Sequence, residues 1–365
     1  MKHRVIVWGT GFVGKMVLRE LIPHPDFELA GLIVHSPDKV GKDAGEIAGL
    51  DVRTGVRATN DVDAALSQDA DAVAYFANAD IRQMEAIKDM AKPLARGFDV
   101  VNTSVFPLIH PKSAPSSFVA PIERACREGG SSFFTTGIDP GFCQDLIPMT
   151  LMGLTGRVDR VRIQEILDYS TYPNPRTLFE IMGFGRPVDD AKVLQLQPGA
   201  LRFAWGCAVH MLADGLGVAL DEIREVHQRR GTSRTLDLAV GTVKKGTTAG
   251  LRFELQGIVG GEPRIVVEHV TRLAPDVAPD WPGSERGDVY RIQIDGSPSI
   301  RAELAFRGEG DDANAGGCLS TGMRAINAIP AVCAAPPGLL TPFDLPLIPG
   351  RHNMQAPRSG ACSEA

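Results

Sequence analysis

The sequence predicts an α/β fold in which a doubly wound parallel sheet is joined to a second α+β domain with a mostly antiparallel sheet. Up to Thr135, short apolar runs alternate with helical patterns, as expected for parallel strands and their crossover helices. Glycines at positions 9, 11 and 14 stand between the first apolar run and the first helical pattern. After Phe142 this alternation ends, and strand-like runs separated by glycine-rich turns take over.

Chain length and this change of pattern together predict two domains. A chain of 365 residues suits two cores, since a domain usually holds roughly 100–200 residues. We expect residues 1–140, completed by residues 316–350, to form the parallel-sheet domain, and residues 141–315 to form the second domain. The polar segment 351–365 is expected to be a flexible tail.

The elements of the first domain follow one another in strand–helix order. The expected strands are the apolar runs Arg4–Trp8, Glu28–Val34, Ala72–Phe76, Asp99–Asn102 and Ser131–Thr135. The helical patterns between them are Phe12–Leu21, Val62–Leu66, Ile81–Leu94 and Ser117–Glu128. Right-handed crossovers between parallel strands then predict the doubly wound topology.

The second domain is expected to open with a helix at Gln144–Leu154 and a strand at Arg157–Leu167, followed by a mainly helical stretch at Ala191–Val218. The later strand-like runs are Arg224–Gln228, Thr235–Val243, Ala249–Val259, Arg264–Leu273, Asp288–Ile294 and Ile300–Arg307. The glycine-rich run Gly308–Gly317 is predicted to be a loop. A helix at Leu319–Val332 is then expected to return to the first domain.

Composition and charge narrow the possible partners. A formal net charge of −6 and a pI near 5.8 argue against nucleic acid or an anionic membrane as partner and favour a small molecule. No apolar run reaches the roughly 18–20 residues of a membrane span, and the N-terminus lacks the features of a signal peptide, so we expect a cytoplasmic protein. The six cysteines are scattered, without the spacing of zinc ligands, and we expect no metal site.

The run Gly9-Thr10-Gly11-Phe12-Val13-Gly14 predicts a dinucleotide cofactor in a Rossmann domain. Gly9 permits a tight turn, Gly11 lets a pyrophosphate approach the backbone, and Gly14 allows close packing of helix on strand. The N-terminus of the following helix offers unpaired N–H groups and a partial positive charge to the phosphates. The alternative is a glycine-rich turn with no ligand.

The end of the second strand favours NADP(H) over NAD(H). Enzymes specific for NAD tend to carry an acidic residue there for the ribose 2′-hydroxyl, whereas this chain offers His35, Ser36 and Lys39, which suit a 2′-phosphate. In the alternative interpretation Asp38 holds the ribose and NAD is preferred. Residues that follow two further strands are expected to border the ribose and nicotinamide: Ala77, Asn78, Asn102 and Thr103.

Several runs together resemble the dihydrodipicolinate-reductase-like dehydrogenases, the family that includes 2,4-diaminopentanoate dehydrogenase and the native NAD(P)-dependent amine dehydrogenases. The resemblance covers nearly the whole chain. It implies a homodimer whose active site lies between the two domains, where hydride passes from nicotinamide to the carbon of a C=O or C=N bond. The runs are Val5–Gly14, Lys39–Glu46, Thr136–Phe142, Met211–Gly217 and Ala325–Pro330.

This chain departs from the family pattern after the strand Asp99–Asn102. Amine-forming members carry a carboxylate in a Thr-Cys-Glu-Glu-like run, where this chain reads Thr103-Ser104-Val105-Phe106-Pro107. Val105 and Phe106 are expected in the substrate pocket, and a cationic intermediate would need another counter-charge. The departure favours carbonyl reduction over amine formation. The run Tyr169–Pro173 also differs from the pattern of the diamine enzymes.

Hydride transfer further needs groups that orient substrate and move a proton, and four residues are the catalytic candidates. Asp139 lies on the loop after the last Rossmann strand, although it could instead cap the next helix. Tyr169 and Tyr172 are possible proton donors or packing residues. Glu165 could supply the missing carboxylate or be a solvent-facing strand residue.

Three more residues are candidates for the substrate pocket: Phe142, His210 and Thr321. A histidine at such a helical position is more often a core residue, which is the favoured alternative for His210. The sequence lacks the motifs of metal-assisted or covalent nucleophilic catalysis. Our first hypothesis is therefore an NADPH-preferring reductase of a small ketone, aldehyde or imine, with reductive amination as the version that the resemblance implies. The second is a true amine dehydrogenase whose counter-charge is Glu165 or Asp139. A catalytically silent NADPH-binding regulator or sensor is the alternative outside the enzymes.

Overall fold

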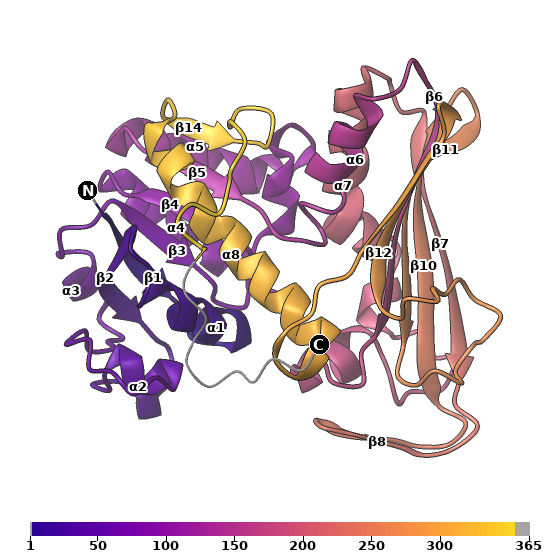
Figure 1. The fold of residues 1–365 in the computed structure, drawn as a ribbon, viewed down its shortest axis with the longest axis horizontal. Coiled ribbons are helices and arrows are strands. Elements are labelled where there is room, and N and C mark those ends of the chain that lie inside the picture. Colours follow the sequence, from indigo (N-terminus) through magenta and orange to yellow (C-terminus); the bar gives the residue numbers. More distant parts are fainter. Residues whose placement is uncertain (1, 355–365) are drawn as a thin grey trace. The chain divides into compact units, whose positions relative to one another are not determined.

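The computed structural model describes residues 2–354, which form two compact units (Figure 1). The first unit holds the chain up to Asn102, the segment Ile122–Phe133 and the chain from Ala325 onward. The second holds Thr103–Pro121 and Phe134–Arg324. From residue 355 on, the tail expected at 351–365 lies outside the described residues.

The first unit is built on a six-stranded sheet with the strand order β14-β5-β4-β3-β1-β2. Pairing is parallel between β1 and β2, β1 and β3, and β3 and β4, and all residues of β3 and β5 are buried, as expected for strands covered on both faces. The predicted doubly wound sheet is confirmed. Its strands are β1 (His3–Trp8), β2 (Phe27–Ile33), β3 (Ala72–Tyr75), β4 (Asp99–Asn102), β5 (Ser132–Thr135) and β14 (Gly338–Leu340).

Helices connect these strands in the expected places. The long ones carry apolar residues at helical spacing, and α1 buries Val17, Leu18 and Leu21 on one side. The helices are α1 (Phe12–Leu21), α2 (Ala44–Ala48), α3 (Val62–Ala65), α4 (Gln83–Ala95) and α5 (Ser116–Gly129).

The second unit contains a six-stranded sheet with the order β13-β12-β6-β11-β10-β7. Only the pair β6–β11 is parallel among its strand pairs, so the predicted mostly antiparallel sheet is confirmed. Helix α7 (Ala200–Leu216) packs on one face of this sheet and shares its apolar core. The strands are β6 (Arg157–Asp168), β7 (Glu222–Gly231), β10 (Thr248–Val259), β11 (Glu262–Arg272), β12 (Val289–Ser297) and β13 (Ile300–Leu304).

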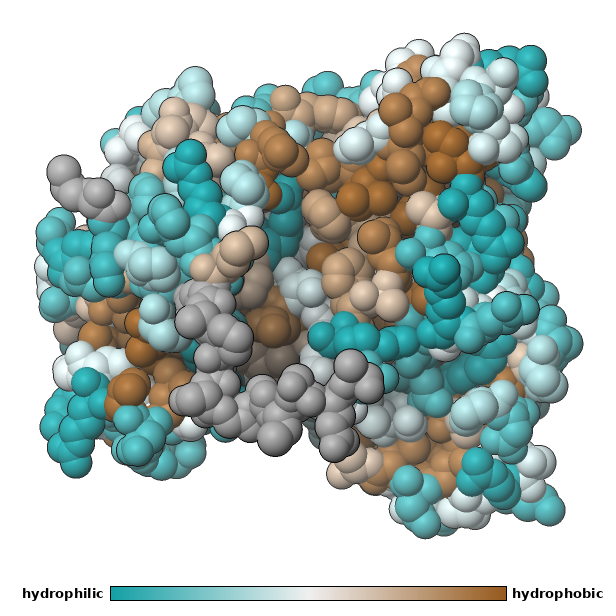
Figure 2. Space-filling view, viewed as in Figure 1, coloured by the Kyte–Doolittle hydropathy of each residue, from teal (hydrophilic) through white to brown (hydrophobic). Residues whose placement is uncertain are grey.

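Charged side chains cover the opposite face of the same sheet. Glu268 is 0% exposed and accepts hydrogen bonds from Arg162, Arg252 at 2.7 Å and Gln164 at 2.9 Å. Because both carboxylate oxygens are used, this charge is buried but compensated. Figure 2 shows a contrasting, apolar surface over α6 (Leu146–Met152), next to which Leu154 is 68% exposed.

Two expectations about the second unit were wrong in detail, and a third was confirmed with a later helix start. The run Gly308–Gly317 is not all loop, because α8 (Ala313–Ala334) begins within it. The Asp312 side chain accepts a hydrogen bond from the backbone N–H of Ala315 at the start of this helix. Gly316 packs against the backbone of residues 306 and 307. The stretch Ala191–Val218 is mainly helical, as expected, although α7 begins only after Gly199. The run Thr235–Val243 is a hairpin of β8 (Leu236–Leu238) and β9 (Gly241–Val243).

Within residues 2–354, no helix has the length and apolar character needed to cross a membrane.

Candidate active site

The glycine-rich loop has the shape that a pyrophosphate site requires. Gly9 has a φ of +104°, and a Cβ atom there would lie 2.6 Å from the backbone nitrogen of Ala77. A Cβ atom on Gly14 would lie 2.0 Å from the carbonyl oxygen of Gly9, so α1 can approach β1 only with glycine at that position. A Cβ atom on Gly11 would meet nothing within 4 Å. The space in front of Gly11, at the N-terminus of α1, therefore fits a dinucleotide phosphate.

The other residues of the loop differ in exposure. Thr10 is buried, Val13 is half-buried and Phe12 is 44% exposed. Lys39 reaches this loop from the segment after β2: its Nζ donates to the carbonyl oxygen of Thr10 at 2.9 Å and to the Thr10 hydroxyl at 3.1 Å. An ammonium group has three protons, so Lys39 keeps one for a ligand. His35 and Ser36 are exposed beside it.

The remaining cofactor candidates end the third and fourth strands. Ala77 follows β3 and touches Gly9 through its backbone. Asn78 is held in a tight turn, with its Nδ2 donating to Asp80 at 2.9 Å. Asn102 is fully buried at the end of β4, and Thr103, which is half-buried, is the first residue assigned to the second unit.

The second unit brings ionisable side chains together in one row across its sheet. Strand register pairs Phe253 with His269, His269 with Glu165, and Glu165 with Tyr290. Neighbouring strands place such partners on the same face of a sheet. His269 and Glu165 are each 3% exposed, which excludes the alternative that Glu165 is a solvent-facing strand residue.

Asp139 meets this row from the loop after β5. Its Oδ1 lies 2.9 Å from Nε2 of His269 and accepts a hydrogen bond from Trp205 Nε1 at 2.8 Å, while Oδ2 accepts one from Gln144 Nε2 at 2.6 Å. The loop turns back through Gly141, whose φ is +139° and whose Cβ would lie 2.4 Å from the carbonyl oxygen of Gly137. Asp139 is therefore not a helix cap; α6 is capped by Asp145, whose side chain accepts from Leu146 N.

Glu165 is the second acid at His269. Its Oε1 lies 3.3 Å from Nδ1 of His269 and accepts a hydrogen bond from the Tyr169 hydroxyl at 2.7 Å. The ring of Tyr172 stacks on that of Tyr169, with centroids 4.8 Å apart. All four catalytic candidates from the sequence, Asp139, Glu165, Tyr169 and Tyr172, thus belong to one cluster, which we call the His269 cluster.

Proton affinities in the His269 cluster are strongly shifted. Burial disfavours a charged imidazole, but the carboxylates of Asp139 and Glu165 outweigh burial and raise the pKa of His269 to about 10. Burial also opposes ionisation of Glu165, yet the neighbouring imidazolium lowers its pKa. Burial, together with the nearby Glu165, raises the pKa of Asp139. Burial and the adjacent Glu165 carboxylate raise the pKa of Tyr169 well above its ordinary range. At neutral pH, His269 is an imidazolium between two acids.

The spacing of Asp139, Glu165 and His269 would also suit a metal ion, since one ligand atom of each lies within 4.8 Å of the others. Their hydrogen bonds argue for protons instead. Each imidazole nitrogen already faces a carboxylate, and the N–H and O–H groups of Gln144, Trp205 and Tyr169 point at the carboxylate oxygens. The cluster is therefore a network of hydrogen bonds between two acids, one imidazole and their N–H and O–H donors.

Phe142 and Thr321 lie near the loop that carries Asp139. Phe142 is half-buried under the Arg324 guanidinium, 5.3 Å from its ring centroid. Thr321 on α8 lies beside Gly137, since a Cβ there would be 3.7 Å from the Thr321 methyl carbon.

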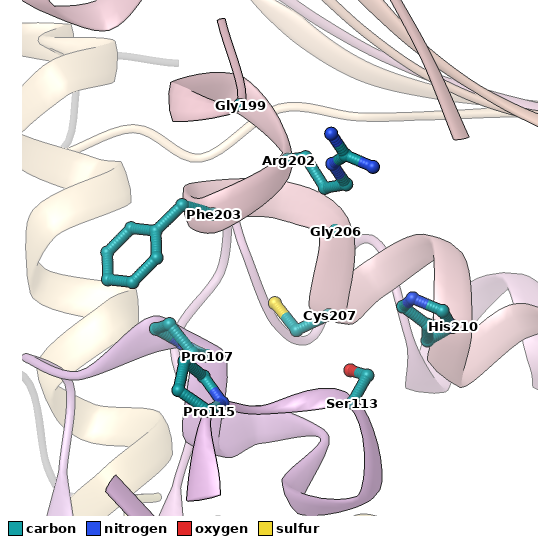
Figure 3. A pocket seen from close by; sticks show the side chains of 9 residues that line it. All are labelled: Pro107, Ser113, Pro115, Gly199, Arg202, Phe203, Gly206, Cys207 and His210. Carbon is teal, nitrogen blue, oxygen red and sulfur yellow. The ribbon is translucent and has the colours of Figure 1, made fainter. Parts of the chain in front are cut away.

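His210 also lies in the second unit, but outside the His269 cluster. Its ring stacks on His110 with centroids 5.8 Å apart and faces a cavity of about 260 Å³ between α7 and the segment around residue 110 (Figure 3). No residue of the His269 cluster lines this cavity. Val105 is fully buried and Phe106 half-buried at the start of the same segment. The lining residues are Pro107, Ser113, Pro115, Gly199, Arg202, Phe203, Gly206, Cys207 and His210.

Sequence reasoning missed four members of the cluster: Gln144, Trp205, His269 and Tyr290. His269 stands alone in an apolar strand, and only the register of β11 on β6 brings it to Glu165. No local pattern in the sequence could have found it.

Comparison with known proteins matches both halves of the chain to dehydrogenase families. Residues 142–357 match the 2,4-diaminopentanoate dehydrogenase C-terminal domain, and residues 3–94 match the N-terminus of dihydrodipicolinate reductase. The chain is 42% identical over 347 residues to an amine dehydrogenase of Streptomyces virginiae, covering 94% of this chain and 96% of that protein. It is 26% identical over 250 residues to 2,4-diaminopentanoate dehydrogenase of Acetoanaerobium sticklandii, covering 68% and 66%.

Solved structures show the same fold. The amine dehydrogenase from Mycobacterium smegmatis superposes with a TM-score of 0.79 at 22% identity, over 96% of this chain and 98% of that one. GenD2 from gentamicin A biosynthesis, solved in complex with NAD, matches with a TM-score of 0.52 at 16% identity, over 90% and 86%. At these identities the likeness concerns architecture, and function must be argued from the site.

Proposed function

Since this chain belongs to the family of the 2,4-diaminopentanoate dehydrogenase C-terminal domain, as its sequence motifs predicted, we infer that it is an NAD(P)-dependent oxidoreductase acting on amines or carbonyl compounds. The observation that carries this inference is 42% identity to an amine dehydrogenase over 94% of the chain. The Gly9–Gly14 loop adds the physical requirement, a phosphate site at the N-terminus of α1.

The bound nicotinamide supplies or accepts the hydride, and the protein supplies orientation, charge and protons. The backbone around Gly11 holds the pyrophosphate and so fixes the cofactor on the first unit. We propose that the His269 cluster faces the substrate and sets the charge that the reacting group meets.

We propose reductive amination, or its reverse, as the favoured form of the reaction. Asp139 and Glu165 together carry two negative charges when ionised, against one positive charge on His269. One negative charge is then in excess in a buried place, which favours a cationic iminium or ammonium group. This acid pair takes over the role of the carboxylate missing at Val105. Reduction of a carbonyl group to an alcohol is the second candidate.

We also propose that NADP(H) is the preferred cofactor. No acidic residue follows β2 directly, and Lys39 stands at the loop with one ammonium proton unused. A 2′-phosphate would meet Lys39 together with the exposed His35 and Ser36.

Oxidation of NADPH against a panel of small ketones and aldehydes, with and without excess ammonium and with NADH in parallel, tests these proposals. Consumption that requires ammonium supports reductive amination, and consumption that does not supports carbonyl reduction. Tight NADPH binding without turnover on any substrate would instead support the sensor. A higher kcat/KM with NADH than with NADPH would contradict the cofactor preference.

We propose further that the enzyme works as a homodimer in the cytoplasm, as the family resemblance and the composition imply. Light scattering coupled to size-exclusion chromatography measures the mass directly. A mass near 39.1 kDa would contradict the dimer.

A further inference from the structure

We propose that Tyr169, Glu165 and His269 form a proton-delivery chain for carbonyl reduction, in which Tyr169 is the donor to the substrate oxygen and His269 is the proton reservoir. This inference rests on the oxidoreductase function proposed above. It assigns separate roles to three side chains, Glu165 and His269 buried and Tyr169 partly buried, that the family relationship does not distinguish.

One atom, Oε1 of Glu165, lies at the centre of this proton-delivery chain. The Tyr169 hydroxyl and Nδ1 of His269 both contact Oε1 of Glu165, at 2.7 Å and 3.3 Å. A proton can therefore pass from the imidazolium to the carboxylate oxygen and from there to the tyrosine oxygen without a water molecule between them. The stacking of Tyr172 on Tyr169, at 4.8 Å, fixes the plane of the donor ring.

The proton balance follows from these contacts. When hydride adds to the carbonyl carbon, the C=O π electrons become a lone pair on oxygen, and this alkoxide takes the proton of the Tyr169 hydroxyl. The tyrosinate left behind would stand against the Glu165 carboxylate. Glu165 therefore passes it a proton while taking one from Nδ1–H of His269. The protein ends with neutral Tyr169, ionised Glu165 and neutral His269, which solvent protonates again.

The direction of this transfer agrees with the proton affinities. Burial and the adjacent Glu165 raise the pKa of Tyr169 well above 10, whereas the pKa of His269 is raised only to about 10. A proton on the imidazolium thus moves downhill to the tyrosinate. It is also present at the start, because His269 is protonated at neutral pH.

Other groups around His269 hold the reservoir in place. Asp139 faces its Nε2 and is fixed by Gln144 and Trp205, so Asp139 is a positioning residue for the charged ring. The Phe253 ring stacks on the imidazole at 4.4 Å. The titratable groups around His269 and its two acids come from five elements: Asp139 and Cys143 on the loop after β5, Glu165 and Tyr169 on and after β6, Cys207 on α7, Tyr290 on β12 and Cys318 on α8.

A comparison of carbonyl and iminium substrates distinguishes proton delivery by Tyr169 and His269 from a purely structural role of these residues. An alkoxide needs a proton, but an iminium ion that accepts hydride becomes a neutral amine without one. Tyr169→Phe and His269→Gln should therefore slow reduction of the best ketone in the panel by about 100-fold, the usual contribution of a general acid. Both variants should slow reduction of a preformed cyclic imine, supplied as its iminium ion, by less than about 10-fold.

Two further tyrosines give matched comparisons. Tyr75 on β3 also donates to a carboxylate, Asp89 at 2.9 Å, and its hydroxyl accepts a hydrogen bond from Arg82, outside the His269 cluster. Tyr75→Phe should therefore leave the ratio of the ketone rate to the iminium rate unchanged. Tyr290 also bonds Glu165, and Tyr290→Phe should affect ketone reduction less than Tyr169→Phe does. Equal losses on ketone and iminium substrates in Tyr169→Phe, or a larger loss in Tyr290→Phe, would overturn the proposal.

The reservoir is tested without turnover by NMR titration of the protein labelled with ¹⁵N-histidine, with His269→Gln to assign the signal. We expect the His269 ring to stay protonated until about pH 10 in the wild type and to deprotonate at lower pH in Glu165→Gln. A neutral His269 ring at pH 8 would refute the reservoir even in an active enzyme. A wild type that reduces no substrate would refute the proposed function, whatever this titration shows.

Discussion

Raising the pH is expected to destabilise this protein through His269, and replacing that residue by glutamine should remove the effect. Burial opposes the imidazolium, but Asp139 and Glu165 outweigh it and raise the pKa of His269 from 6.5 to about 10. A group whose pKa is higher in the folded state stabilises that state fully below its unfolded pKa. The contribution of His269 is then lost as the pH rises from 6.5 toward 10.

The size of the effect follows from that window. Well between the two pKa values, each pH unit changes the free energy of unfolding by about 1.4 kcal/mol. Because the unfolded histidine is still half protonated at pH 6.5, the loss between pH 6.5 and 8.5 is roughly 2.3 kcal/mol. The measurement should stop near pH 8.5. Burial raises the pKa of the Cys126 thiol from 9.0 to about 12, so above pH 9 this thiol also lowers the free energy of unfolding as the pH rises.

Urea denaturation of the wild type and of His269→Gln at these two pH values measures the difference directly. The wild type should lose about 2–3 kcal/mol more than the variant between pH 6.5 and 8.5. Glu165→Gln should lose less than the wild type, since one of the two acids that hold the proton is gone. Parallel losses in the wild type and His269→Gln would refute the claim that His269 is a buried imidazolium.

Three further predictions follow from other contacts. Gly11→Ala should leave the melting temperature unchanged, because a Cβ there meets nothing within 4 Å. The same variant should weaken NADPH binding at least about 10-fold in a fluorescence titration. Gly14→Ala should also lower the melting temperature, because its Cβ would lie 2.0 Å from the Gly9 oxygen. Lys39→Met should cut the ratio of kcat/KM for NADPH over NADH about 10-fold, and an unchanged ratio would assign Lys39 a structural role only. Glu268→Ala should lower the free energy of unfolding by about 3–5 kcal/mol in urea, because it removes the fully buried acceptor that Arg162, Arg252 and Gln164 share, and a loss below about 1 kcal/mol would contradict that account.

Features that depend on residues close together in the sequence could be predicted from it. The loop from Gly9 to Gly14 joins one strand to one helix, so its glycine spacing alone predicts the shape that the structure has. The glycine-rich run from Gly308 was misleading for a physical reason. Gly316 is there to let α8 approach the backbone of residues 306 and 307, so the glycine serves close packing and not a flexible loop.

The His269 cluster depends on contacts between residues far apart in the sequence. Glu165 and His269 are 104 positions apart, and they meet because β11 pairs with β6 in parallel and in one register. A shift of one residue would turn His269 to the opposite face, where Glu268 now bonds Arg162 and Arg252. The sequence showed that Glu165 and Asp139 were acids near the domain junction, but it could not show the base between them.

The charge of this cluster explains how one site could serve both reactions proposed for it. With His269 protonated and both acids ionised, the cluster carries one excess negative charge, which favours an iminium ion that needs hydride but no proton. A neutral carbonyl group gains less from this charge and instead needs a proton, which Tyr169 can give and His269 can restore. Removal of the reservoir proton should therefore separate the two activities. Above about pH 10, where His269 is neutral, carbonyl reduction should fall while the excess negative charge, and with it the preference for iminium ions, grows.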